Sequence, residues 1–201
     1  MDEKSRMING KLYMMNEGLF EQQSQAKILI KAYNKTKPNQ LKKRKKLLVE
    51  LLGKTGKSPY IEPSFFCDYG KNITVGDNFY ANTGCIVLDS APVTIGNQVM
   101  FGPRVSLFTA THPIDAGVRN RRLEYAKPIT IGNGVWIGGD VTINPGVTVG
   151  DNAIIGAGSV VTKAIPPNVI ATGNPCKVIR EITKEDKSYW EAQEQAYHKS
   201  Q

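Results

Sequence analysis

The chain has 201 residues, 40% of them hydrophobic, and its 26 basic and 18 acidic residues give a formal net charge of +8 at pH 7. This length and apolar content suffice for one or two domains with a buried core. No apolar run approaches the ~18 residues of a membrane span and no basic-then-apolar signal region opens the chain, so we expect a soluble cytoplasmic protein with no membrane partner. The positive charge favours an anionic partner without identifying one.

Residues 1–57 are rich in Lys, Gln, Glu, Leu and Met. Two segments, beginning at Leu19 and Asn39, carry apolar residues at spacings of three and four, which predicts two short helices ended by Pro38 and Gly53. We expect these helices to form an N-terminal cap over the open end of the region that follows.

The basic run KKRKK at residues 42–46 is compatible with a nucleic-acid patch. Such a run is more typical of the solvated face of a helix whose other face is buried, so we expect no nucleic-acid partner. The predicted buried face consists of Leu41, Leu47, Leu48, Leu51 and Leu52.

Residues 58–182 are dominated by a repeat of six. From Ile129 onward every sixth residue is aliphatic or small, an Ile or Val stands two places later, and a Gly or Asn usually follows it. The sixth-residue positions are Ile129, Val135, Val141, Val147, Ala153, Ser159 and Ile165. The same spacing occurs earlier at Ile73, Phe79 and Cys85, and after a two-residue slip at Val93, Val99 and Val105.

A strict period of six fits neither an amphipathic helix nor an alternating strand. It is typical of a parallel β-helix, so we predict an all-β solenoid rather than a Gly-rich sandwich with accidental spacing. Each hexad would form one face: a few strand residues, then a turn where Gly or Asn adopts a positive φ at low cost. The sixth residue is small because it points into a narrow interior.

Two further segments interrupt or end the repeat. Residues 109–128 leave the hexad pattern, and a loop of this length inside a compact repeat is usually functional. This loop contains His112, one of two histidines in the chain. After Pro166 and Pro167, Thr183 and Asp186 resemble a capping box, so we expect a C-terminal helix within residues 183–201 that closes the other end of the solenoid.

The cysteine and histidine content argues against a metal site. Cys67, Cys85 and Cys176 are odd in number and lack CxxC spacing, so we expect neither a disulfide framework nor a zinc cluster. A carbonic anhydrase built on such a solenoid would need three histidines on zinc, and this chain has only His112 and His198.

Several stretches together resemble one family. They are the loop TATHPID, the turn FYANTGCIVLD, the repeats from PITIGNG to IPPN, and the ending GNPCKVIREI. The chain from about residue 5 to 185 is similar to the maltose and galactoside O-acetyltransferases of the hexapeptide-repeat class. The resemblance implies a left-handed parallel β-helix with short helical caps at both ends. It also implies acetyl-CoA as donor, a sugar hydroxyl as acceptor, and a homotrimer with active sites between subunits. The handedness comes from the resemblance alone, because crossover connections are otherwise right-handed in ~98% of cases.

The chemistry of acetyl transfer agrees with the loop histidine. A base must take the proton of the attacking hydroxyl, and an imidazole suits this task at neutral pH. His112 is the candidate base, and Glu124 in the same loop is the candidate that orients it. A backbone N–H at Gly138 or Gly139 is the candidate donor to the oxyanion of the tetrahedral intermediate.

The resemblance places acceptor contacts on Asp68, Asn82 and Asp89, although the position of Asp68 is often serine in the family. Where the family commonly has an acidic contact in the N-terminal helix, this chain has Met14, near Glu17. Glu17 is therefore a further candidate, and the identity of the acceptor stays open.

Coenzyme A needs a slot for its extended arm and cations for its phosphates. Turns without bulky side chains suit the arm, and Trp136 either packs beside it or is an outward aromatic. The resemblance implies phosphate and adenine contacts near the last coils. The candidate residues are Trp136, Gly138, Gly139, Ala157, Gly158, Thr162, Lys163, Lys177 and Arg180.

Two other functions are compatible with the sequence. One is the same reaction on another acceptor, such as an antibiotic or a nodulation-type amino sugar. The other is a non-catalytic structural solenoid, which would need neither a histidine loop nor a basic cluster.

Overall fold

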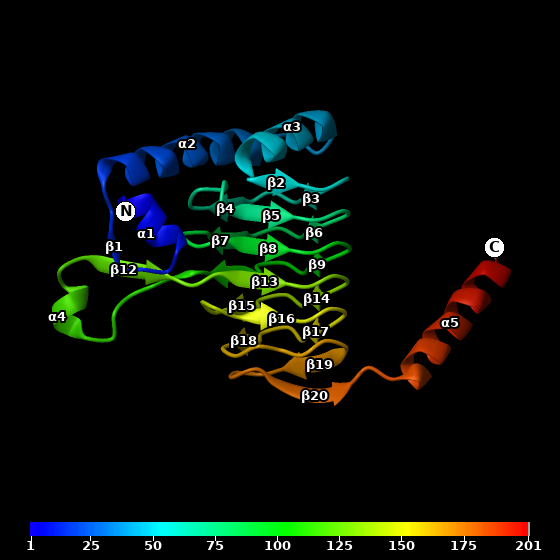
Figure 1. The fold of residues 1–201 in the computed structure, drawn as a ribbon. Helices are drawn as coiled ribbons and strands as arrows, with labels where there is room; N and C mark the ends of the chain where they lie inside the picture. The colour runs from blue at the N-terminus through cyan, green and yellow to red at the C-terminus, as the bar shows by residue number, and fades with distance from the viewer. Residues whose placement is uncertain (201) are drawn as a thin grey trace.

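A computed structural model describes residues 1–200 and shows a three-sided solenoid with helices at its N-terminal end (Figure 1). Helix α1 (Glu3–Ile8) and the short strand β1 (Tyr13–Met14) precede helices α2 (Glu17–Asn34) and α3 (Leu41–Leu51). Helices α2 and α3 lie across the first coil, and α1 lies beside the solenoid. Within residues 1–200, no helix is both long and apolar enough to span a bilayer.

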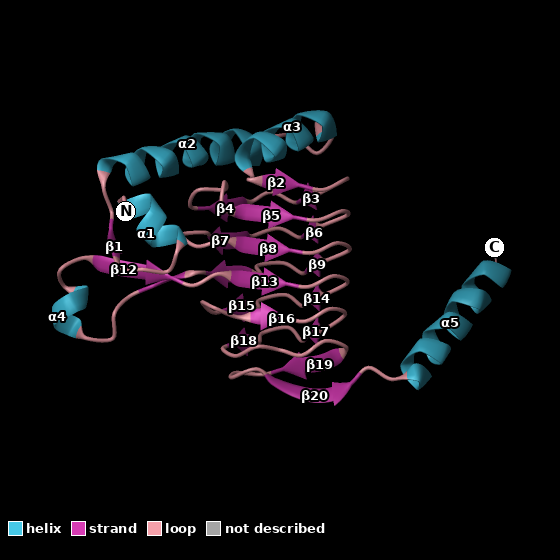
Figure 2. Cartoon of the chain, in the orientation of Figure 1, coloured by secondary structure: helices cyan, strands magenta, loops and turns pink. Residues whose placement is uncertain are grey.

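Parallel strands stack into three sheets, one on each side of the solenoid (Figure 2). The first sheet contains β2 (Lys54–Thr55), β5 (Ile73–Val75), β8 (Val93–Ile95), β13 (Ile129–Ile131) and β16 (Thr148–Val149). The second contains β3 (Tyr60–Ile61), β6 (Tyr80–Ala81), β9 (Met100–Phe101), β14 (Trp136–Ile137), β17 (Ile154–Ile155), β19 (Val169–Thr172) and the antiparallel β20 (Lys177–Glu181). The third contains β4 (Phe65–Cys67), β7 (Cys85–Leu88), β10 (Ser106–Phe108), β15 (Thr142–Ile143) and β18 (Val160–Val161). The coils make about six left-handed turns, so the predicted left-handed β-helix is confirmed.

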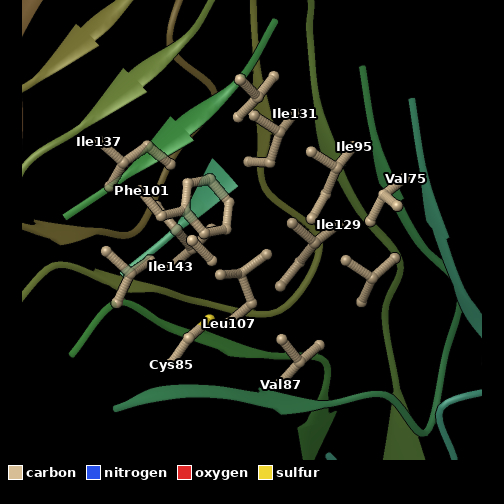
Figure 3. Packing of buried hydrophobic residues seen from close by; sticks show 14 of the residues in the cluster. Val75, Cys85, Val87, Ile95, Phe101, Leu107, Ile129, Ile131, Ile137 and Ile143 are labelled. Atoms are coloured by element: carbon tan, nitrogen blue, oxygen red, sulfur yellow. The ribbon is translucent and has the colours of Figure 1, made fainter. Parts of the chain in front are cut away.

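Both apolar positions of each hexad point into the solenoid (Figure 3). Ile129 and Ile131 are 0% and 1% exposed, whereas Thr130 between them faces outward and is exposed. The register stacks equivalent positions of successive coils, as in the row Val75, Ile95 and Ile131. Full burial of each aliphatic side chain contributes about 1.5–3 kcal/mol, so the repeated pair in every hexad supplies most of the stability of the fold.

The glycines that follow these pairs have a different role from the one expected. Gly132 does not adopt a positive φ, but a Cβ there would lie 2.3 Å from Asp151 Oδ1 and 2.7 Å from Asp151 N. Glycine is needed because successive coils approach too closely for a side chain. The positive φ falls two residues later, at Gly134, Asp140, Gly146, Asn152 and Gly158.

A ladder of side chains supports one corner of the solenoid. The Oδ1 atom of Asn97 accepts a hydrogen bond from Asp77 N at 2.7 Å, and that of Asn133 accepts one from Asn97 N at 2.9 Å. The Oδ1 atom of Asp151 accepts a hydrogen bond from Asn133 N at 2.7 Å. Each coil therefore satisfies a backbone donor of the coil before it, where no ladder hydrogen bond is available.

The buried face of helix α3 differs at two residues from the face predicted from the sequence. Leu48, Leu51 and Leu52 are buried, but Leu41 is 54% exposed. Arg44 is only 5% exposed and donates from Nε to Thr36 Oγ1 at 2.9 Å and from Nη1 to Tyr60 OH at 3.1 Å. One member of the basic run is thus a buried, hydrogen-bonded residue, because α3 turns that side toward the first coil.

The C-terminal helix does not close the solenoid. Helix α5 (Lys184–Lys199) begins with the expected capping box of Thr183 and Asp186, yet none of its residues is buried and it stands away from the coils (Figure 1). The expectation that it covers this end is wrong for the single chain. The last coil strand, β19, is already paired by β20, which folds back along it.

We predict that Gly96→Ala destabilises the fold strongly, because the added Cβ would lie 2.7 Å from the carbonyl carbon and oxygen of Gly132 in the next coil. Overpacking of this kind costs about 1–3 kcal/mol or more. Gly18→Ala is the matched control: its nearest atom is 3.8 Å away in helix α2, where alanine is favoured over glycine by about 1 kcal/mol. Urea unfolding measures both, and equal stability of the two variants would contradict the close-approach explanation.

Candidate active site

The extruded loop is an ordered element attached to the solenoid. It contains β11 (Ala110–Thr111), the short helix α4 (Ala116–Arg119) and β12 (Leu123–Ala126). Strands β1, β12 and β11 form a small three-stranded sheet, so the N-terminal segment holds the loop from outside (Figure 1).

His112 follows β11 directly and opens onto a pocket of about 580 Å³. The imidazole is exposed, so it is accessible to a substrate entering the pocket. The residues that line the pocket are Met14, Met15, His112, Arg119, Arg122 and Glu124. A second cavity of about 290 Å³ lies under α1 and α2, but its lining contains no histidine.

Two contacts shape the loop around His112. Arg119 Nη1 donates to Pro113 O at 2.9 Å and to Ile114 O at 3.0 Å, which fixes the chain immediately after the histidine. Tyr13 OH donates to Glu124 Oε2 at 2.8 Å. Within residues 1–200 no hydrogen bond joins Glu124 to His112, so the orienting role of Glu124 stays a prediction.

Sequence reasoning missed four residues of this site: Tyr13, Met15, Arg119 and Arg122. The two arginines could have been proposed from the sequence, since the run RNRR follows His112 within the same loop. Tyr13 could not have been proposed in this way, because its partner Glu124 lies 111 residues away in the sequence.

The predicted acceptor contacts do not gather in one pocket of a single chain. Asp68 is half-buried, and its pKa is raised by burial, with an opposing effect of Lys27 and a further raising effect of the Glu124 carboxylate. Asp68 therefore lies near the loop. Asn82 follows β6 on another side, where its Oδ1 accepts from Thr83 N at 2.7 Å, and Glu17 is exposed at the start of α2.

Asp89 is buried in the single chain and is bonded to the backbone. It is 0% exposed, and its Oδ1 accepts from Asp68 N at 3.0 Å and Tyr69 N at 2.9 Å. Its Oδ2 is buried without a partner among the described residues. Burial raises the pKa of Asp89 to about 6, although hydrogen bonds from the backbone of Tyr69 and Asp68 oppose that shift.

The candidate coenzyme turns stack at one corner of the solenoid. Gly138 N donates to Ile155 O at 2.8 Å and Gly158 N donates to Gly139 O at 2.9 Å. Because the N–H of Gly138 is occupied, it is not available to an oxyanion. The N–H groups of Gly139 and Ala157 donate to no residue within the described chain, so they are available to a ligand.

The remaining coenzyme candidates lie on or beside the last coils. Trp136 points outward from β14 and is 50% exposed, and Thr162 and Lys163 are exposed after β18. Lys177 and Arg180 lie on β20. Arg180 is paired with Asp186 through contacts of 2.5 and 2.9 Å from its two terminal nitrogens, so a phosphate there would compete with this carboxylate.

Two family models match the chain. Residues 6–56 match the maltose acetyltransferase hexapeptide capping motif, and residues 128–163 match the bacterial transferase hexapeptide of six repeats. Galactoside O-acetyltransferase of Escherichia coli strain K12 is 47% identical over 191 residues, which cover 94% of each chain. The chain belongs to the maltose and galactoside O-acetyltransferase family.

Solved structures of this family superpose closely on the chain. The maltose O-acetyltransferase from Clostridium difficile 630 has a TM-score of 0.90 at 49% identity and covers 91% of this chain and 98% of its own. A galactoside acetyltransferase in complex with coenzyme A also has a TM-score of 0.90, at 47% identity, with 93% and 94% covered. This O-acetyltransferase family member therefore keeps the whole fold, cap and repeats included.

We predict that Asp89→Asn flattens part of the pH dependence of stability in this family member. Because the pKa of Asp89 is raised from 3.8 to about 6, the folded chain binds the proton more tightly, so the stabilising contribution of Asp89 is fully present below about pH 4 and is lost as pH rises to about 6. The size of this loss is roughly 3 kcal/mol. Asparagine is neutral throughout and keeps the Oδ1 acceptor.

The unfolding free energies of the wild type and of Asp89→Asn, measured at pH 4.5 and pH 7.5, test this prediction. The variant should gain stability relative to the wild type at the higher pH. The same pH dependence in both proteins would show that Asp89 does not titrate in this range.

Proposed function

We propose that the chain transfers the acetyl group of acetyl-CoA to a hydroxyl group of a sugar of the galactoside or maltose type, with His112 as general base. The observation that carries the proposal is an accessible imidazole on the extruded loop, over a pocket of about 580 Å³, in a member of this family. The galactoside acetyltransferase that resembles the chain at a TM-score of 0.90 binds coenzyme A, which supports the donor.

The reaction needs one proton to move twice. The His112 imidazole accepts the proton of the sugar hydroxyl while its oxygen attacks the thioester carbonyl carbon. The carbonyl oxygen of the tetrahedral intermediate becomes negative, and the available N–H of Gly139 is the donor we assign to it. Collapse of the intermediate breaks the carbon–sulfur bond, and the imidazolium returns the proton to the leaving thiolate.

The coenzyme would lie along the corner that contains Gly139, Ala157 and Gly158. A Cβ at Gly158 would meet no atom within 4 Å, so the surface there is open to a ligand, and the Ala157 N–H points to no protein acceptor within residues 1–200. Lys163 and Lys177 are the exposed cations that we assign to phosphates. Arg180 is the weakest candidate because Asp186 already neutralises it.

We also propose the homotrimer that the family resemblance implies, with its interface on the apolar side of the solenoid. The outward side chains of the first sheet are Lys54, Thr74, Thr94, Thr130 and Thr148. Those of the second sheet are Tyr60, Tyr80, Met100, Trp136, Ile154 and Ile170. Contiguous apolar patches of this kind mark interaction surfaces. An interface between subunits would also bring Asn82 of one chain toward the loop of another.

Acetylation of a panel of sugars, followed by release of the free thiol of coenzyme A, tests the proposed function. We expect turnover with a galactoside, maltose or glucose. Turnover only with an antibiotic or an amino sugar would keep the chemistry and replace the acceptor, and the absence of acetyl-CoA binding by calorimetry would favour a structural solenoid.

We predict that His112→Ala lowers kcat by about 10²–10⁴, the range typical of a lost general base. Acetyl-CoA binding and folding should persist, since the loop lies outside the coil interior and the exposed imidazole leaves no buried cavity. His198→Ala, which removes the only other histidine, from the exposed helix α5, is the matched control and should keep wild-type rates. Wild-type turnover by a folded His112→Ala protein would remove this residue from the mechanism.

We predict that Met100→Glu dissociates the oligomer, because it places a charge in the centre of the apolar second sheet, where Met100 is 53% exposed in the single chain. Thr94→Glu is the matched control in the same coil, on the polar first sheet. Sedimentation at micromolar concentration should show a trimer for the control and smaller species for Met100→Glu. A monomeric wild-type protein would contradict the proposed assembly.

A further inference from the structure

Tyr13 and Glu124 share one row of the small sheet, and His112 follows directly after the strand that flanks β12 on its other side. Strand register pairs Tyr13 on β1 with Glu124 on β12. It also pairs Thr111, the last residue of β11, with Tyr125, and continuing this register one residue past the strand sets His112 opposite Glu124. Residues directly opposite in an antiparallel pair project from the same face, with Cβ atoms about 4.5–5.5 Å apart. The row therefore runs Tyr13, Glu124, His112.

Tyr13 is the rigid end of this row. It is 1% exposed and packs in a small buried cluster with Met7, Leu19 and Tyr69. Its hydroxyl donates to Glu124 Oε2 at 2.8 Å. Burial raises the pKa of Tyr13, with an opposing effect of Ser90 and a further raising effect of Glu124, so the phenol remains a hydrogen-bond donor at neutral pH.

Glu124 lies between Tyr13 and His112 in the row. Its Oε1 atom has no hydrogen-bond partner among the described residues, and its side chain lines the same pocket as His112. A free glutamate side chain samples several rotamers, and holding one oxygen removes that freedom. The other charged groups on the pocket wall are Arg119, which is bonded to the loop carbonyls, and Arg122.

We infer that Tyr13 is a positioning residue of the acetyl transfer: it holds one carboxylate oxygen of Glu124 so that the other faces the imidazole of His112. Tyr13 lies outside the sequence motif of the loop, because it belongs to the N-terminal segment. The inference rests on the proposed role of His112 as base, since an oriented imidazole matters only if the imidazole accepts a proton.

A double-mutant cycle on the full-length protein tests the inference. Tyr13→Phe removes only the hydroxyl and keeps the ring in its cluster, and Glu124→Gln keeps the shape of the partner. We expect each single variant to lower kcat by about tenfold, the scale of a lost hydrogen bond to a charged group. The KM for acetyl-CoA should stay unchanged, because the coenzyme turns lie elsewhere.

Non-additivity is the decisive result. If Tyr13 acts through Glu124, the double variant should be within about twofold of Glu124→Gln alone. Tyr33→Phe is the matched control: Tyr33 is also 1% exposed, and its hydroxyl donates to Ile61 O beneath the N-terminal cap. This control should lower stability without lowering kcat. Multiplicative losses in the double variant, or a kcat loss of equal size in Tyr33→Phe, would overturn the inference.

A measurement without substrate separates this inference from the proposed function. With only two histidines in the chain, the imidazole signal of His112 in a proton NMR spectrum is assigned by its absence in His112→Ala. Tyr13→Phe and Glu124→Gln should each move that signal, and Tyr33→Phe should not. A wild-type protein that acetylates no sugar would refute the proposed function while the signal still reports on the row. An unmoved signal in Glu124→Gln would overturn the inference even if Tyr13→Phe failed to fold.

Discussion

The fixed spacing between successive coils is the constraint on which the rest of the structure depends. Hydrogen bonds such as Gly76 N to Ile95 O and Gly96 N to Ile131 O, both 2.9 Å, tie each coil to the next at the strand separation of about 4.8 Å. At that spacing, corner glycines have backbone atoms of the neighbouring coil where a Cβ would be. The interior takes aliphatic or small residues at most hexad positions, and it also holds Phe79 and Phe101, whose rings meet edge to face at a centroid distance of 5.1 Å.

The same constraint explains where the candidate site lies. A chain that must stack coil on coil has no interior space for a ligand, so chemistry has to be placed on corners, faces and extruded segments. The backbone N–H groups of Gly139 and Ala157 have no acceptor among the described residues, and glycines of the preceding coil leave the space beside them without a side chain. The candidate base, His112, stands on a loop that leaves the coil after β10, and strand β1 holds that loop in place.

Two buried charged residues have roles that their residue types and sequence positions did not predict. Arg44 belongs to a basic run yet ends in a hydrogen-bonded site with Thr36 and Tyr60 under the cap. Asp89 stands where the family resemblance implies an acceptor contact, yet its carboxylate accepts two backbone N–H groups inside the fold. In both cases the charged group satisfies backbone or side-chain partners that would otherwise be buried unpaired.

The sequence by itself determined the solenoid, its hexad register, the extruded loop, the capping box of the last helix and the family. These features are local or periodic, so each is visible within a few residues or as a repeated spacing. The structure decided which glycines serve close approach rather than positive φ, that α5 stands apart, and that Asp89 and Arg180 are already occupied. It also decided that Tyr13 bonds Glu124 on the loop that carries His112. Such facts depend on which residues meet across a sequence separation of 111 positions, and no local pattern in the chain predicts that contact.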